Sequence, residues 1–439
     1  MPILNFPLQE YFLNSAAQEN IALAWKVFNT WWWAALPFIF FKPLAFLWLW
    51  WRRQIWISRV KRINLDVRVP RETIRPLRAM ENVFSGLWQL YDPPNPREKW
   101  LEGKIQLSLA LEIVSIGGDI HFIIRIPEGS RNFIESTIYS QYPDAEIAVI
   151  EDYTKYVPQD IPNKDWDAWG CDYQLLKDDV YPIKTYARFF EERPDVAVEE
   201  KRIDPVSSLL EGMATLKPGE QLWVQILAEP ITPLEDDYVK RGRAVADKIA
   251  RRVVPSPKKS LLLEGFDLMI SGKTPGEVPE VKELIPPEMK LTPGEREVLG
   301  AIEEKVGKYG FRCAIRFLYL SKRDVYFGPA KAIPMSFFTQ FSTQNLNGMK
   351  PWTKTITKVH TITTWFLDKR RVYLRKRKLF RNYIQRLTPL FPRMGGTFVL
   401  NIEELATLYH FPAGRAVVPA PTIPRVEFKK GEAPPGLPI

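Results

Sequence analysis

Cysteine and histidine are the residues that this chain has least of. Its 439 residues include two cysteines, Cys171 and Cys313, and three histidines, His121, His360 and His410. Two cysteines cannot form a disulfide framework or a four-cysteine zinc site, and the histidines are too widely separated to resemble a metal-binding motif. The sequence therefore predicts neither a metal centre nor a bound cofactor.

Catalytic motifs are missing as well. The nearest approach to a phosphate-binding loop is Ser271–Thr274, but the motif needs a glycine five places before Gly272, where Asp267 stands. Pro275 also opposes a helix whose amino end would face the phosphates. The sequence contains no nucleophile elbow, HExxH zinc motif or calcium loop. We expect a protein that is not an enzyme; an enzyme with an unrecognised site is the further alternative.

The overall composition is that of a folded protein with most of its chain in water. Hydrophobic residues make up 46% and aromatic residues 13%, which excludes a wholly disordered chain. The mean hydropathy of -0.20 excludes a protein with many membrane spans. A mass of 51.0 kDa is too large for one compact core and predicts about two to four domains.

Tryptophan is concentrated near the amino terminus, where eight of the fifteen lie between Trp25 and Trp56. Residues 27–51 carry a single charge, Lys42, and as a helix would span about 37 Å, more than the roughly 30 Å of a hydrocarbon core. Two groups of tryptophans match the aromatic belts of a membrane helix: Trp31, Trp32 and Trp33, then Trp48, Trp50 and Trp51. The sequence predicts a transmembrane helix at residues 27–51.

Five basic residues follow this stretch: Arg52, Arg53, Arg59, Lys61 and Arg62. Positive residues are retained on the cytoplasmic side of a membrane. We therefore expect a single-pass protein of the bacterial inner membrane, with residues 1–26 outside and the bulk of the chain in the cytoplasm. Both cysteines would then be reduced thiols.

Residues 58–153 are expected to form a first α/β unit. A strand at 64–70 and a helix at 74–90 are followed by alternating apolar residues on both sides of Gly117-Gly118, which predicts a hairpin that pairs Ile113 with Phe122 and Leu111 with Ile124. A helix at 131–141, which Ser130 could cap, and a strand at 145–150 complete the β-α-β-β-α-β order of a ferredoxin-like fold. His121 falls on the polar face beside Arg125, so we expect it to be solvated.

Residues 180–350 repeat this order with an insertion at about 230–309. A strand at 182–190 and a helix at 206–216 precede the alternating run at Leu222, Val224 and Ile226, whose expected partner begins only at Phe311. Helices are expected at 236–253 and 293–309 within the insertion and at 330–345 after it, and Cys313 is expected to be a buried thiol. The predicted fold class is α+β, with one amino-terminal transmembrane helix and two ferredoxin-like units.

A basic segment at 369–393 contains ten positive charges and no acid. Its apolar residues have partly helical spacing, which predicts a basic helix that could bind a nucleic-acid backbone, anionic lipid or an acidic protein surface, or could simply be a solvated helix face. The candidate binding residues are Arg370, Arg371, Arg375, Lys376, Arg377, Lys378 and Arg381. Residues 395–439 are rich in proline beyond Phe411, and we expect an extended connector or docking tail.

Three stretches of the chain resemble one known family. Val67–Leu87, Leu111–Ile147 and Phe398–Pro412 are similar to the membrane-proximal region of type IV secretion and conjugation proteins, which precedes a HerA- or TraG/TraD-like ATPase domain. Relatives that carry the motor continue into a phosphate-binding loop, whereas this chain stops at Ile439. The resemblance carries over no catalytic residue.

This resemblance implies a non-catalytic membrane platform for a separate translocation ATPase that moves DNA or protein. The expected partners are the membrane, a HerA/TraG-like P-loop ATPase, other copies of the chain in a homo-oligomer, and DNA. The alternative is a direct binder of single-stranded nucleic acid at the membrane, which would use the basic helix.

Overall fold

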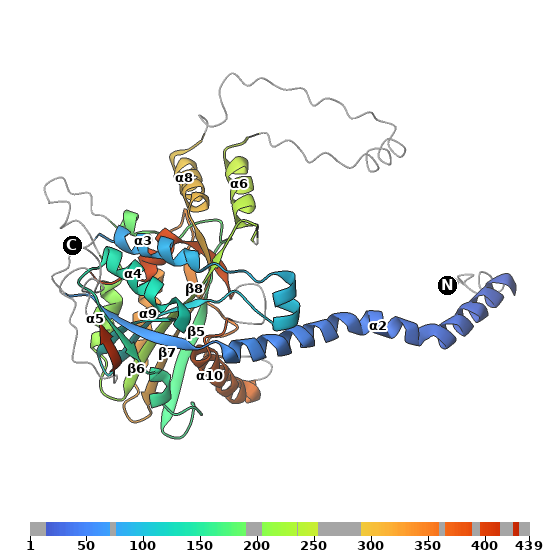
Figure 1. Cartoon of the computed structure of the whole chain (residues 1–439), viewed down its shortest axis with the longest axis horizontal. Helices are drawn as coiled ribbons and strands as arrows, with labels where there is room; N and C mark the ends of the chain where they lie inside the picture. Colours follow the sequence, from blue (N-terminus) through green and yellow to red (C-terminus); the bar gives the residue numbers. More distant parts are fainter. Residues whose placement is uncertain are drawn as a thin grey trace, which may run out of the picture. The chain divides into compact units, whose positions relative to one another are not determined.

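The computed structural model describes residues 15–70, 76–189, 204–234, 236–252, 291–359, 365–388, 396–412 and 425–429 (Figure 1). The chain divides into two compact units. The first consists of Met1–Lys61 and Asp92–Gln106, and the second of Arg62–Tyr91 and Leu107–Ile439.

The first unit is built on one long helix, α2 (Ser15–Arg59), which contacts the short π-helix η2 (Glu98–Glu102). The indole Nε1 of Trp48 donates a hydrogen bond to the carbonyl oxygen of Trp100 at 2.9 Å. Gly103 follows η2 with a φ of 76°, and a Cβ there would lie 2.3 Å from the carbonyl carbon of Arg52. Only glycine allows the chain to pass so close to the α2 backbone.

The predicted transmembrane helix is wrong. Within the part of the chain that the structure describes, no helix combines the length and the apolar character needed to cross a membrane. The prediction counted the tryptophans of α2 as apolar, although each indole has a polar N–H, and Lys42 interrupts the run. The predicted localisation, a single-pass protein of the inner membrane, depended on this helix and is wrong for the same reason. The expected belt residues Trp31, Trp32, Trp33, Trp48, Trp50 and Trp51 are exposed along α2.

The basic residues that were expected to set membrane topology have other positions. Arg52, Arg53 and Arg59 lie in the carboxyl-terminal part of α2, and Arg59 is in its last turn, where positive charge complements the helix dipole. The guanidinium of Arg52 lies over the ring of Trp48, 5.8 Å from its centroid. Lys61 follows the helix, and Arg62 is the first residue of strand β1.

The second unit contains an antiparallel sheet of ten described strands, in the order β10-β4-β1-β3-β2-β6-β7-β5-β8, with β9 also paired to β7. The strands are β1 (Arg62–Arg68), β2 (Leu109–Ile116), β3 (Asp119–Pro127), β4 (Glu146–Ile150), β5 (Trp166–Leu175), β6 (Glu220–Ile231), β7 (Gly310–Lys322), β8 (Met349–Pro351), β9 (Phe398–Asn401) and β10 (Arg425–Lys429).

Two predicted strand pairings are confirmed. In the β2–β3 hairpin, Ile113 lies opposite Phe122 and Leu111 opposite Ile124, and both turn glycines have positive φ angles. Across the insertion, Val224 of β6 lies opposite Phe317 of β7. In the hairpin the alternation of apolar residues also fixed the register, because a slip of one residue would have turned the apolar face toward the wrong side. For β6 and β7 the sequence predicted the partner strands and no register.

The prediction of two separate ferredoxin-like units is wrong. β2 pairs with β6 along its whole length, from Leu109↔Ala228 to Ile116↔Gln221, so a single sheet runs through both halves of the unit. Apart from Ile116 at its end, β2 is buried throughout, and an unpaired β2 edge would leave backbone groups unsatisfied. The strand order β4-β1-β3-β2 is matched by β8-β5-β7-β6 on the other side of the seam.

One strand was placed incorrectly from the sequence. The described residues 182–189 contain only the short 3-10 helix η5 (Tyr186–Arg188), and the strand next to β7 on the side away from β6 is β5. Its Trp169, Cys171 and Tyr173 alternate toward the main core. That alternation was present in the sequence, but Gly170 and flanking acids concealed it.

Helices cover both faces of the sheet. The main core packs against α3 (Arg78–Leu87), α4 (Arg131–Gln141), α5 (Ser207–Ala214), α9 (Ala332–Thr339) and α11 (Ile402–Leu408), and the opposite face packs against α10 (Asp368–Ile384). The predicted bounds of α4 are confirmed, although the Ser130 side chain makes no capping hydrogen bond. α6 (Tyr238–Ile249) and α8 (Pro293–Gly307) of the insertion lie side by side (Figure 1).

The predictions for Cys313, His121 and the carboxyl-terminal tail can also be compared with the structure. Cys313 is fully buried, as predicted. His121 is not solvated: it is 1% exposed, with its ring nitrogens 3.2 Å from an Asp66 oxygen and 3.1 Å from an Asp119 oxygen, because the second face of the sheet is covered too. The expected tail from 395 contains core elements, since β9, α11 and Phe411 are buried.

Candidate functional site

Helix α10 lies on the second face of the sheet and is held by its apolar side. Leu379, Phe380 and Tyr383 are buried, and the ring of Tyr383 lies 5.2 Å from that of Trp223 on β6. These positions recur at helical spacing, so the opposite side of the helix must face outward. The basic helix predicted at 369–393 is present over Asp368–Ile384, so it ends earlier than predicted, and its orientation on the sheet is fixed by packing.

A buried ion-pair network fixes the carboxyl end of α10. Arg386 is 4% exposed, and its guanidinium contacts Glu112 at 3.0 Å and Asp152 at 2.6 Å. Although burial opposes the shift, the charge of Glu112 raises the pKa of Arg386 well above its ordinary value. Arg386 also adopts a left-handed φ of 51°, which costs a non-glycine residue about 1–2 kcal/mol. The network thus stabilises the backbone turn that ends the helix.

Four of the predicted binding residues are exposed on the outward side of α10. Arg370, Arg377, Lys378 and Arg381 stand at positions i, i+7, i+8 and i+11, which places them on one face that extends about 16 Å along the helix axis. We call these four residues the basic face. Among the described residues, no carboxylate lies within ion-pair distance of any of them. Their charges are therefore available to an external partner.

The other three predicted binding residues have internal partners. Arg371 lies 3.6 Å from Asp368. Arg375 donates to the carbonyl oxygens of residues 353 and 356, and Lys376 forms an ion pair with Asp167 at 2.7 Å. Arg375 and Lys376 lie toward the sheet because they are one turn from Leu379. The structure thus divides the predicted set into four cations without a described carboxylate partner and three with internal partners. Of the four, Arg377 donates a hydrogen bond to the hydroxyl of Tyr373 at 3.1 Å.

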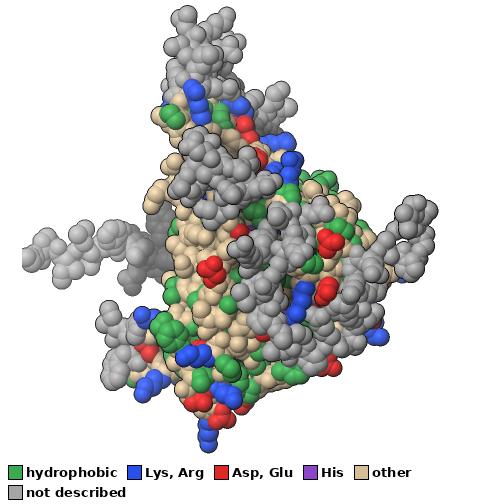
Figure 2. Space-filling view, turned by 90° about the vertical axis from the view of Figure 1, so that its left-hand side faces the viewer, with side chains coloured by type: hydrophobic (Ala, Val, Ile, Leu, Met, Phe, Trp, Pro, Cys, Tyr) green, Lys and Arg blue, Asp and Glu red, His purple; other side chains and the backbone are tan. Residues whose placement is uncertain are grey.

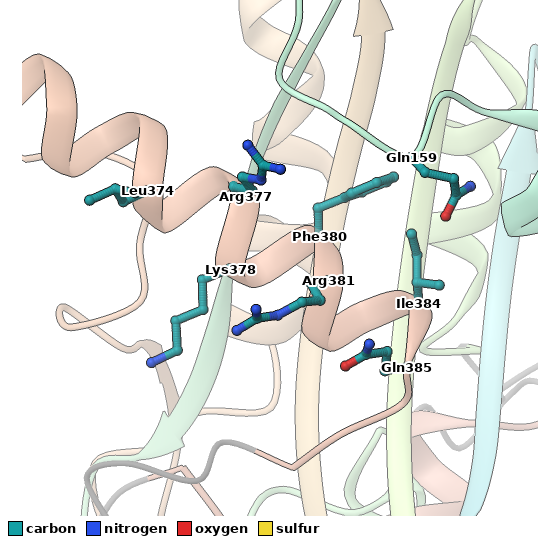
Figure 3. Close-up of a pocket in the computed structure, with 8 residues that line it drawn as sticks. All are labelled: Gln159, Leu374, Arg377, Lys378, Phe380, Arg381, Ile384 and Gln385. Atoms are coloured by element: carbon teal, nitrogen blue, oxygen red, sulfur yellow. The ribbon is translucent and has the colours of Figure 1, made fainter. Parts of the chain in front are cut away.

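A hollow of about 470 Å³ adjoins the basic face (Figure 3). Arg377, Lys378 and Arg381 line it together with Leu374, while Phe380 and Ile384 point toward the loop that carries Gln159. Gln385 lies at the end of the helix. The site therefore joins positive charge, two amides and a small apolar surface.

Sequence reasoning did not find Gln159 or the apolar members of this hollow. Gln159 lies in an aperiodic loop more than 200 residues before α10, and no local pattern connects the two. Leu374 could have been found, because it lies one turn from both Arg370 and Lys378 on a helix that was already predicted.

On the face seen in Figure 2, basic and acidic side chains are interspersed over the described surface. A second hollow, of about 500 Å³, lies beside Lys308, but this lysine contacts Glu81, Glu304 and Glu403. An anion would have to displace one of these carboxylates, so this hollow is a poorer candidate.

No group of three or more histidine, cysteine, aspartate or glutamate side chains is placed to hold a metal ion in the ranges that the structure describes. The two described histidines, His121 and His410, each contact aspartate. His360, Arg393 and the loop-like sequence Ser271–Thr274 lie outside the described residues.

Comparison with known proteins gives one match. The model of a family described as "Domain of unknown function (DUF8128)" matches residues 56–413. No curated protein and no solved structure matches the chain. The matched range begins near the end of α2 and includes the whole sheet except β10, as well as the basic face.

Proposed function

The chain belongs to the DUF8128 family, and we propose that this member is a non-catalytic binding protein that holds the phosphate backbone of a nucleic acid on the basic face of α10. The observation that supports the proposal is the set of four exposed cations, at helical spacing, with no carboxylate partner among the described residues. A surface helix that only needed solubility would be expected to pair such charges with acids.

The geometry predicts how binding should respond to salt. If three or four phosphates are neutralised, the logarithm of the binding constant should fall with the logarithm of the salt concentration with a slope of about -2 to -3 for a single strand. Arg377 and Arg381 are one helical turn apart, about 6 Å along the axis. Adjacent phosphates can therefore be held from one helix without bending the protein.

The test compares two double variants by fluorescence anisotropy with a labelled oligonucleotide. R377Q/R381Q removes two charges of the basic face, and R243Q/K248Q removes two exposed charges from α6. We expect the first pair to weaken binding at least tenfold and to reduce the magnitude of the salt slope by about 1.4, which is about 0.7 for each lost phosphate contact to a single strand. The second pair should change both quantities little.

Equal losses in the two double variants would refute the assignment of the site, since charge alone would then explain binding. If no oligonucleotide binds at any salt concentration, the nucleic-acid proposal fails. A protein with an acidic surface then becomes the partner to seek, and the same variants map its contact.

A second candidate function is that of a platform for a separate translocation ATPase. The observation that favours it is that two of the stretches resembling secretion and conjugation proteins fold together. Leu111–Ile147 forms most of β2 together with β3 and α4, and Phe398–Pro412 forms β9 and α11, all on one sheet. Co-purification with a P-loop ATPase, lost when residues 415–439 are deleted, would support this function, and purification without any ATPase would count against it.

A further inference from the structure

Gln159 is the one polar group in the hollow that belongs to a different part of the fold from α10. Its Nε2 donates to the carbonyl oxygens of Thr154 at 2.7 Å and Val157 at 3.0 Å. Both neighbours are acceptors, so the nitrogen must face them and the amide cannot be flipped. The side-chain oxygen Oε1 of this exposed residue therefore has no donor partner among the described residues, and Figure 3 shows it on the side of Ile384.

An acceptor oxygen beside a row of cations sets two requirements on a ligand. The cations Arg377, Lys378 and Arg381 attract negative charge, whereas Oε1 of Gln159 repels it and accepts a hydrogen bond from a donor group. A simple anion satisfies only the first requirement. A nucleotide whose base carries an amino group satisfies both, with its phosphate toward the basic face and its base edge toward Gln159.

We propose that the hollow beside α10 accepts an unpaired nucleobase and that Gln159 selects bases presenting an amino group, so cytosine is bound in preference to thymine. This inference rests on the proposed nucleic-acid function. Cytosine offers its N4 amino group as a donor, whereas thymine offers the O4 oxygen in the same place. The apolar surface of Ile384, which lies beside Gln159, can contact the ring of either base, so discrimination depends on the one hydrogen bond. A base must leave its duplex to enter, so the strand bound is single-stranded.

The size of the preference follows from a single hydrogen bond. The net free energy that one hydrogen bond contributes to binding corresponds to about a 2- to 10-fold difference in affinity. Oligo(dC) and oligo(dT) of about 12 nucleotides, matched in length and label, should therefore differ by this factor in binding to the full-length wild-type protein. The salt slopes should be equal, because the phosphates are the same.

Two variants and one modified ligand test the role of Gln159. Q159M removes the acceptor and should reduce the dC/dT affinity ratio to about one, while binding of oligo(dT) is retained. Q385M removes the other amide of the hollow and should leave the ratio unchanged. Because Gln159 also supports its own loop, the wild-type protein should be tested with an oligonucleotide of N4,N4-dimethylcytosine, which lacks the donor and should bind like oligo(dT).

The outcomes separate this inference from the proposed function. Equal affinity for oligo(dC) and oligo(dT), or a preference that persists in Q159M or with the dimethylated ligand, overturns the inference while the salt-dependent binding to the basic face stands. Absence of binding to every oligonucleotide overturns both. A preference that disappears with the dimethylated ligand and in Q159M, but not in Q385M, supports the assignment of Gln159.

Discussion

Replacing Arg386 by methionine is the perturbation whose effect can be derived most fully from the structure. Methionine keeps a long apolar side chain but removes the guanidinium, which contacts Glu112 at 3.0 and 3.3 Å and Asp152 at 2.6 and 3.0 Å. Glu112 is fully buried, so its charge has no access to water. The variant therefore leaves a carboxylate inside the protein without its counter-ion.

Removing one partner of a buried ion pair costs about 3–5 kcal/mol. Glu112 keeps hydrogen bonds from Tyr153 and Gln225, and Asp152 keeps its contact with Arg125. These remaining donors place the expected loss at the lower end, about 3 kcal/mol in the free energy of unfolding. Methionine has the same difficulty as arginine with a left-handed φ, so the backbone contributes nothing further to the difference.

The loss should be measured by urea unfolding followed by far-ultraviolet circular dichroism, with R381M as the control. Arg381 is exposed on the same helix, so its replacement should change the free energy of unfolding by less than about 0.5 kcal/mol. Hydrogen exchange of residues 379–384 gives a local measure. If α10 opens more easily by 3 kcal/mol, its amides should exchange about 100-fold faster in R386M.

The effect of R386M should also depend on pH. Although burial opposes it, Arg386 holds the pKa of Asp152 well below its usual range in the folded protein. A depressed carboxylate pKa contributes stability that is present above the unfolded value of about 4 and lost as the pH falls through the folded value. The difference between wild type and R386M should therefore shrink below about pH 4. A loss below 1 kcal/mol at pH 7, or equal losses in R386M and R381M, would refute this account of the network.

Two further predictions concern the sheet. Although burial lowers the pKa of His121, the hydrogen bonds that its ring donates to Asp119 and Asp66 outweigh burial and raise that pKa to about 8, so about 2 kcal/mol of stability should be lost as the pH rises from 6.5 through 8. Unfolding curves from pH 6 to 9 measure this, and H121N should remove the dependence; a wild-type protein as stable at pH 9 as at pH 6 would contradict it. In β5, a Cβ at Gly170 would lie 2.2 Å from the carbonyl oxygen of Phe317, so G170A should cost about 1–3 kcal/mol in thermal unfolding. G294A is the control, because a Cβ at Gly294 meets nothing within 4 Å. Equal changes in stability in G170A and G294A would show that the close approach of β5 to β7 does not require glycine at position 170.

The sequence predicted correctly those parts of the fold in which a local pattern of apolar residues is compatible with a single pairing or a single helix. The β2–β3 register follows from two apolar runs around a two-residue turn, and only one alignment brings both apolar faces to the same side. The pairing of β6 with β7 was found across the insertion because both runs alternate strongly. Helix α4 was predicted with its observed bounds because Gly129-Ser130 precedes a short amphipathic segment.

The wrong predictions concern residues and strands whose burial depends on other parts of the chain that pack against them. His121 has the position of an exposed residue on a half-buried sheet, and alternation alone cannot show that the second face is covered as well. The seam between β2 and β6 joins two runs that the sequence could only treat as separate edges. For α2, tryptophan content was taken as evidence of a lipid environment, although an indole is both apolar and a hydrogen-bond donor.

The basic segment shows why counting charge overestimates a binding surface. Ten cations were counted in residues 369–393, but Lys376 neutralises Asp167, and Arg386 neutralises Glu112 and Asp152 inside the protein. The helical period separates these groups from the basic face only after Leu379 and Tyr383 identify the buried side. Lys376 and Arg386 therefore hold α10 in place on the sheet. Because the helix is held in this orientation, Arg377 and Arg381 face outward. The size of a binding surface therefore depends on which cations are exposed and unpaired, and not on the net charge of the segment.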